Sequence, residues 1–134
     1  MSELTITTSQ IQGDVSVTVF HLTGHLHGST EQELLDRARQ AYEDGARYLL
    51  LEMSELDVLA SAGLRAIQNV FKLFTPQEDV EVMRQHGDEP YKSPYFKIVC
   101  AKPEIYYILN ITGFLQNILI YNNLADATNS FDSQ

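Results

Sequence analysis

The chain has 134 residues, of which 44% are hydrophobic, and its 18 acidic residues against nine basic ones give a net charge of −9. This length and apolar content are typical of one globular domain with its own core. The acidic balance argues against general binding to nucleic acid or to anionic membranes, because that binding needs clustered Lys and Arg. Neither residue type occurs before Arg37 or after Lys102.

The apolar segments and the single cysteine predict where the protein resides. No run of eighteen apolar residues is present, so no membrane span is expected. Residues Met1–Thr7 have neither a basic region nor a long apolar stretch, so no signal peptide is expected. Cys100 is the only cysteine and lies in the apolar run Ile98–Ala101, which favours a buried structural thiol in a reducing compartment. We therefore expect a cytoplasmic protein.

Two strands are predicted at the start of the chain. Leu4–Thr7 alternates weakly and predicts a short edge strand, followed by a turn at Gln12–Asp14. Val15–Leu22 is rich in β-branched residues and predicts a longer strand. Its apolar positions change phase at Val19 and Phe20, which indicates a bulge or a strand covered on both faces. Thr23–Gly28 is the predicted exit of this strand.

The first helix is predicted from residues at helical spacing between Leu34 and Tyr42. Ser29 and Thr30 are the candidate N-caps, and Glu33 stands where a capping box with Thr30 requires it. Gly45 is expected to close the helix.

The centre of the chain predicts a buried strand followed by a second helix. The apolar run Tyr48–Leu51 is typical of a strand covered on both faces. We expect a short acidic turn over Ser54–Leu59, and then a helix that starts within the small residues Ala60–Gly63. Apolar positions from Leu64 to Phe74 give this helix its buried side, and Thr75-Pro76 ends it.

The last part of the chain alternates strands and helices after a polar segment. Residues 76–95 are polar and interrupted by prolines, which predicts an exposed excursion with at most one helical turn, at Val80–Met83. The further predicted elements are a strand at Phe96–Cys100, a helix from Pro103 to Gly113, a short strand at Gln116–Tyr121 and a last helix from Leu124 that fades at Ser130. The sequence therefore predicts an α/β fold, with a mixed sheet of about five strands and four or so helices packed against it.

At this point the chain resembles the STAS domain, the fold of bacterial anti-sigma-factor antagonists and of the cytosolic domains of sulfate transporters. The stretches that carry the resemblance are Val19–His27, Leu50–Leu64, Leu109–Phe114 and Ile120–Ala127. The resemblance covers nearly the whole chain apart from residues 76–95. It implies a single STAS-like domain over residues 1–134.

The resemblance also implies a phosphorylation site. The family motif is a hydrophobic residue followed by Asp-Ser-Ser/Thr-Gly-Leu, and its first Ser is the phosphoacceptor of a partner kinase that is itself the anti-sigma factor. Ala60 stands at the Asp position, Ser61 at the phosphoacceptor and Ala62 at the second Ser/Thr, followed by Gly63 and Leu64. The hydroxyl is kept, whereas its acidic neighbour is replaced.

Two roles are open for Ser61 at this stage. The structural role is a helix N-cap, worth about 1 kcal/mol. The functional role is phosphorylation. A helix N-terminus tolerates an anion, and a phosphate adds about −1.5 to −2 charges to a docking surface.

Three histidines fall on or after the second predicted strand. His21, His25 and His27 share one face if the strand extends that far. The resemblance implies acidic residues where His25 and His27 stand. The histidines are open to three interpretations: exposed imidazoles at a strand end, a metal site, or a pH-sensitive group beside Ser61.

The acidic cluster Glu52, Glu55 and Asp57 precedes Ser61 and has two interpretations. Paired carboxylates carry out acid–base catalysis, but such a cluster also forms a solvated turn. The sequence shows no nucleophile with an adjacent base and no glycine-rich phosphate loop. We therefore expect a non-enzymatic protein without a cofactor.

The function predicted from these features is a regulatory interaction module. Its expected partner is an anti-sigma factor or related serine kinase of the GHKL type, which the module removes from a sigma factor. The predicted binding surface consists of Ser54, Leu56, Asp57, Leu59, Ser61, Gly63, Leu64, Arg65, His25 and His27. Two alternatives remain: a STAS scaffold or homodimer that has lost the phospho-switch, and a small-ligand or metal-binding protein that uses His25 and His27.

Overall fold

A computed structural model describes residues 3–85, 91–111, 113 and 116–132. In chain order its elements are β1 (Leu4–Gln12), β2 (Ser16–Leu26), α1 (Glu31–Glu43), β3 (Leu49–Leu59), α2 (Ser61–Leu73), α3 (Gln77–Gln85), β4 (Phe96–Val99), α4 (Pro103–Ile111), β5 (Leu119–Tyr121) and α5 (Leu124–Asp132). The strands form one mixed sheet in sequence order, antiparallel between β1 and β2 and parallel thereafter. The predicted α/β fold is confirmed, with five helices in the described part where four or so were expected.

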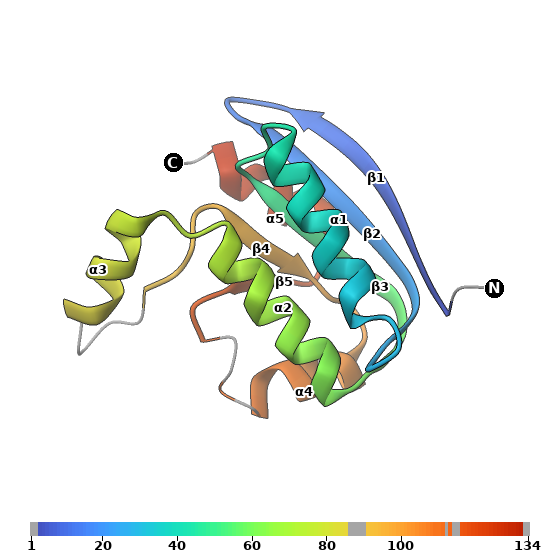
Figure 1. Cartoon of the computed structure of the whole chain (residues 1–134). Helices are drawn as coiled ribbons and strands as arrows, with labels where there is room; N and C mark the ends of the chain where they lie inside the picture. Colours follow the sequence, from blue (N-terminus) through green and yellow to red (C-terminus); the bar gives the residue numbers. More distant parts are fainter. Residues whose placement is uncertain (1–2, 86–90, 112, 114–115, 133–134) are drawn as a thin grey trace.

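The sheet is covered on both faces by apolar side chains, but unequally. Helices α1, α2 and α4 supply the larger buried cluster, to which Phe20 and Leu22 of β2 also belong. Figure 1 shows α1 and α2 side by side over this face. Val17 and Val19, the alternate residues of β2, join a smaller cluster under α5 with Phe131. The phase change seen in the sequence therefore marks a strand that is covered on both faces.

Strand β3 continues through the segment predicted as an acidic turn, so that prediction is wrong. The register of β3 against β2 shifts twice, and each shift leaves one extra residue on β3. Met53, Leu56 and Leu59 consequently face the larger cluster at a spacing of three residues instead of two. This spacing hid the strand, because a regular strand repeats its buried face every second residue.

The N-caps of α1 and α2 are not formed as the sequence predicted. Thr30 stands at the N-cap position of α1, but its hydroxyl donates to the carbonyl oxygen of His25 at 2.9 Å instead of capping the helix, so the capping box does not form. Ala60, with extended backbone, is the N-cap residue of α2, and Ser61 is the first helical residue. The predicted N-cap role of Ser61 is therefore wrong. The reason is the 3.0 Å hydrogen bond from the Ala60 N–H to the Leu26 carbonyl, which keeps Ala60 extended beside β2.

Other predicted boundaries are close to the observed ones. Gly45 follows the end of α1 with a φ of +110°, and α4 begins at Pro103, both as expected. Within the predicted excursion, α3 is a nine-residue helix and so exceeds one turn, while residues 86–90 lie outside the described part. Helix α5 continues past Ser130 to Asp132, because Phe131 is buried. Within the described ranges no helix is long and apolar enough to cross a membrane.

Candidate functional site

The carboxyl end of β2 and the start of α2 lie against each other and form one edge of the molecule. We call this edge the Ser61 edge. It consists of residues 25–30, which run from the end of β2 into the following loop, residues 54–59 of β3, and residues 60–65 at the start of α2. The Ala60 N–H donates to the Leu26 carbonyl oxygen across it. The structure thus brings His25 and His27 to the same edge as Ser61, as the expected parallel connection requires.

Gly63 sets how closely α2 approaches β2. A Cβ atom added at Gly63 would lie 2.7 Å from the Leu26 carbonyl oxygen and 2.8 Å from Leu26 Cγ. A side chain at this position would therefore push the helix start away from the strand. Glycine is required here by close approach, whatever it contributes to a partner.

The sequence-predicted surface residues divide into two groups. Leu56, Leu59, Gly63 and Leu64 are buried in the described structure, so they hold the edge in shape. The other members are exposed or half-buried: Ser54, Asp57, Ser61, Arg65, His25 and His27.

Ser61 and Arg65 lie one turn apart on the exposed side of α2. Arg65 Nη2 pairs with Glu31 Oε1 of α1 at 3.2 Å. Within the described part of the chain, no side chain caps α2, and its first turn holds no acidic residue. The positive end of the helix dipole is therefore open to an anion beside Ser61.

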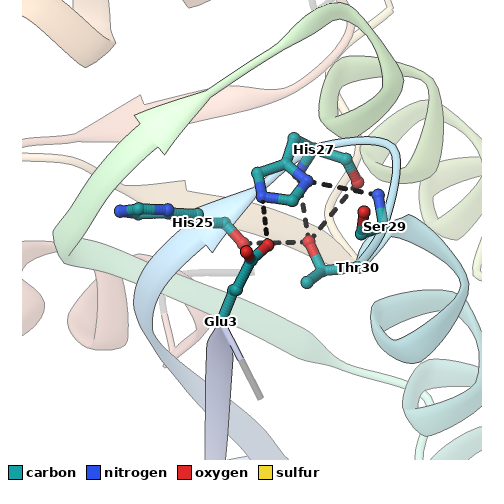
Figure 2. Close-up of polar contacts among 5 residues, drawn as sticks. All are labelled: Glu3, His25, His27, Ser29 and Thr30. Carbon is teal, nitrogen blue, oxygen red and sulfur yellow. Dashed lines mark hydrogen bonds and ion pairs between the residues drawn. The ribbon is translucent and has the colours of Figure 1, made fainter. Parts of the chain in front are cut away.

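The two histidines belong to a hydrogen-bonded loop that links β1, β2 and α1 (Figure 2). His27 Nε2 lies 2.6 Å from Glu3 Oε2, and its Nδ1 accepts the Ser29 N–H at 3.2 Å. The Thr30 hydroxyl accepts the His27 N–H at 3.0 Å. Glu3 is not among the residues predicted from the sequence, because it reaches this loop only through the pairing of β1 with β2. The one feature of the sequence that could have pointed to Glu3 is a charged residue directly before a predicted strand.

His21 does not take part in this loop. Its Nε2 lies 3.1 Å from Ser9 Oγ of β1, four residues along β2 from His25. Across the described residues, no group of three or more His, Cys, Asp or Glu side chains is placed to hold a metal ion. The geometry therefore gives no support to the metal-binding alternative.

The carboxylates of the acidic cluster make separate contacts. Lys102 Nζ lies 2.9 Å from Asp57 Oδ1 and also donates to the Leu56 carbonyl at 3.0 Å. This hydrogen bond and the charge of Lys102 lower the pKa of Asp57, so its carboxyl stays ionised and is not a proton donor near neutral pH. Glu52 Oε1 accepts the Ser54 N–H at 2.8 Å. Sequence reasoning missed Lys102, which is 45 residues away from Asp57.

Apolar side chains are also exposed, one near Ser61 and others on α4. Val58 stands on β3 beside His25, whereas Tyr106, Tyr107 and Ile111 project from α4. Tyr107 and Ile111 are 64% and 61% exposed. Such side chains on one short helix are typical of a surface that meets another protein.

The family follows from a comparison with known domains. A model described as the STAS domain matches residues 8–83, which is more than half of the chain. The chain belongs to the STAS domain family. Comparison with curated protein sequences gives no significant match.

Solved structures share the STAS fold over nearly the whole chain. An anti-sigma factor antagonist from Mycobacterium paratuberculosis is 21% identical with a TM-score of 0.68, and the alignment covers 95% of this chain and 94% of that one. SpoIIAA in its unphosphorylated form is 9% identical with a TM-score of 0.60, over 92% and 94% of the two chains. The phosphorylated form of Bacillus SpoIIAA is 10% identical with a TM-score of 0.58, over 93% and 97%. At these identities the likeness establishes the fold.

Proposed function

We propose that this STAS domain is a non-enzymatic regulatory module that binds an anti-sigma factor or related GHKL-type serine kinase at the Ser61 edge. Phosphorylation of Ser61 by that kinase switches the interaction, and the free module removes the kinase from its sigma factor. One observation carries the proposal: Ser61 is exposed at the first position of α2, where the helix start is open to an anion.

The contacts around Ser61 explain how a phosphate would act there. It adds about −1.5 to −2 charges to an edge that already holds Asp57 and Glu55. It also lies within one helical turn of Arg65, which is 60% exposed and pairs with Glu31. A phosphate competes with Glu31 for this guanidinium, and charge-assisted bonds to Arg favour it. The modification therefore changes the charge of the docking surface while the helix stays folded.

Intact-mass analysis tests the phosphorylation step. The full chain is incubated with ATP and a GHKL-type kinase captured in the pull-down described next, in parallel with Ser61→Ala. Ser29→Ala is the matched control, because Ser29 is an exposed serine on the same edge. We expect one phosphate on the wild type and on Ser29→Ala, and none on Ser61→Ala. An unmodified wild-type chain, or a phosphate retained by Ser61→Ala, refutes the switch.

A pull-down from the source cells tests the partner. Wild-type protein is expected to capture a kinase of the GHKL type, and Ser61→Asp is expected to lose it. Capture by both proteins refutes a charge-dependent interface.

The predicted pH-sensitive role of the histidines has a separate test. Histidine changes charge between pH 5 and 8, and His27 already faces Glu3. We expect the partner affinity to differ between pH 6 and pH 8 and the difference to shrink in His27→Asp. An equal pH dependence in both proteins excludes His27 as the sensor.

A STAS scaffold without phospho-switching is the second candidate. Two observations favour it: Ala60 replaces the acidic residue before the serine, and α4 exposes Tyr107 and Ile111. Light scattering of the wild type against Tyr107→Ser tests it. A dimer that Tyr107→Ser dissociates, together with no phosphorylation, supports the scaffold.

A further inference from the structure

A cavity of about 770 Å³ lies at the end of the sheet opposite the Ser61 edge. It opens between the β1–β2 hairpin, the last turns of α1 and the segment that enters β3. Its lining includes Gln10, Thr18, Phe20, Arg37, Arg47 and Tyr48. This volume falls in the range of pockets that hold small molecules, about 300–1,000 Å³.

Two arginines line this cavity without a carboxylate partner in the described structure. Arg37 donates to the Ile6 carbonyl at 3.3 Å and to Thr8 Oγ1 at 2.9 Å. Arg47 donates to two carbonyls of its own loop and lies over the Tyr42 ring at 3.9 Å. All these partners are neutral. The two guanidiniums are therefore held by neutral groups, and neither forms an ion pair with a described residue.

Arg37 and Arg47 differ in this respect from the other arginines of the chain. With 18 acidic residues against nine basic ones, carboxylates are abundant. Arg39, on the same helix as Arg37, pairs with Asp36, and Arg65 pairs with Glu31. The acidic residue in the described lining is Asp44, whose Oδ1 accepts a hydrogen bond from Gln40. Two positive charges thus face one cavity in a protein that neutralises most of its arginines.

The remaining walls supply both apolar and polar contacts. Tyr48 is half-buried and lines the cavity, whereas Phe20 is 1% exposed and borders it from within the core. On the strands, Gln10 Nε2 donates to Thr18 Oγ1 at 3.1 Å, which fixes a polar patch beside the ring of Phe20. An oxyanion fits the guanidiniums, and Tyr48 offers contact to an apolar body.

We infer that this cavity binds a small organic anion, with its carboxylate or phosphate head on Arg37 and Arg47 and its apolar body beside Tyr48. This inference is independent of the function proposed for Ser61. It gives the protein a ligand site at the amino ends of β2 and β3, at the opposite end of the strands from the partner surface.

An NMR titration of the full ¹⁵N-labelled chain tests the site with three probes. Benzoate and phenyl phosphate carry the two candidate heads on one ring, and benzyl alcohol is the neutral control. We expect saturable shifts of the backbone amides of Gln10, Thr18 and Arg47 with at least one anion, and much smaller shifts with benzyl alcohol. The anion that binds more tightly identifies the head group.

Three variants locate the interaction on the guanidiniums. Arg47→Gln is expected to weaken binding about tenfold, because one charge-assisted contact is lost. Arg37→Gln is expected to do the same, and since it also removes contacts to β1, its fold is checked by the amide spectrum. Arg39→Gln is the matched control and is expected to bind as the wild type does.

Three results overturn the inference. They are the absence of saturable shifts up to about 10 mM probe, equal shifts with benzyl alcohol, and unchanged binding in a folded Arg47→Gln.

Discussion

The two faces of the sheet are both covered by helices, but they bury different kinds of side chain. The face under α1, α2 and α4 is a continuous apolar cluster that is tightly packed around Gly63. The face under α5 is a small cluster that also takes in Lys97, which is 2% exposed. Lys97 Nζ donates to Ser130 Oγ at 2.8 Å and lies 4.3 Å from the centre of the Phe131 ring. We therefore expect the first face to contribute more to stability and the buried amine of the second face to make stability depend on pH.

Truncating one phenylalanine on each face gives the largest expected effect. Phe71→Ala leaves a cavity deep in the larger cluster and is expected to lower the free energy of unfolding by about 4 kcal/mol. Phe131→Ala is expected to cost less, about 2–3 kcal/mol, because the last turn of α5 relaxes into the space more easily. Urea denaturation measures both. A larger loss for Phe131→Ala would reverse the ranking of the two faces.

Adding one methyl group probes the tight packing under α2. Gly63→Ala is expected to destabilise the protein by about 2 kcal/mol, because its Cβ meets Leu26 and Leu59 within 3 Å. Gly28→Ala is the control, since no described atom lies within 4 Å of its added Cβ. It is expected to change stability by less than about 0.5 kcal/mol. Similar melting curves for the two variants would show that the helix start can shift at little cost.

Removing the buried amine probes the second face. Lys97→Met keeps the aliphatic stem and is expected to raise stability by about 1 kcal/mol at neutral pH. Burial lowers the pKa of Lys97 from 10.5, so the unfolded chain binds more protons between the folded pKa and 10.5. Wild-type stability therefore rises relative to the variant as the pH climbs through this window. A constant gap across the window would show that the folded amine titrates like a free one.

The exposed pair between Asp57 and Lys102 is expected to have the smallest effect. Lys102 lowers the pKa of Asp57 below 3.8, so the pair stabilises the fold above that pH and the contribution disappears as the pH falls through the folded pKa. Lys102→Met is thus expected to be slightly less stable than the wild type at pH 6 and equal to it at strongly acidic pH. Acid titration followed by circular dichroism checks this, and a gap that widens on acidification contradicts it.

The sequence predicted the order of strands and helices, because alternating apolar periods carry that information. It did not predict the length of β3. The two bulges place the buried residues Met53, Leu56 and Leu59 three positions apart, whereas a regular strand buries every second residue. It placed Ser61 and the histidines on one edge, because parallel strands end together. The contacts that fix this edge join distant residues, Glu3 with His27 and Asp57 with Lys102, and only the register of the strands brings them together.

The hydrogen bond between the Ala60 N–H and the Leu26 carbonyl has a mechanical consequence. Leu26 precedes His27, and Ala60 precedes Ser61. Gly63 also packs closely against Leu26, so the histidine loop and the start of α2 are held together at two points. A substitution that displaces Leu26 is therefore expected to displace Ser61 as well. A protein docked at the serine is then expected to respond to changes in the histidine loop that it does not contact.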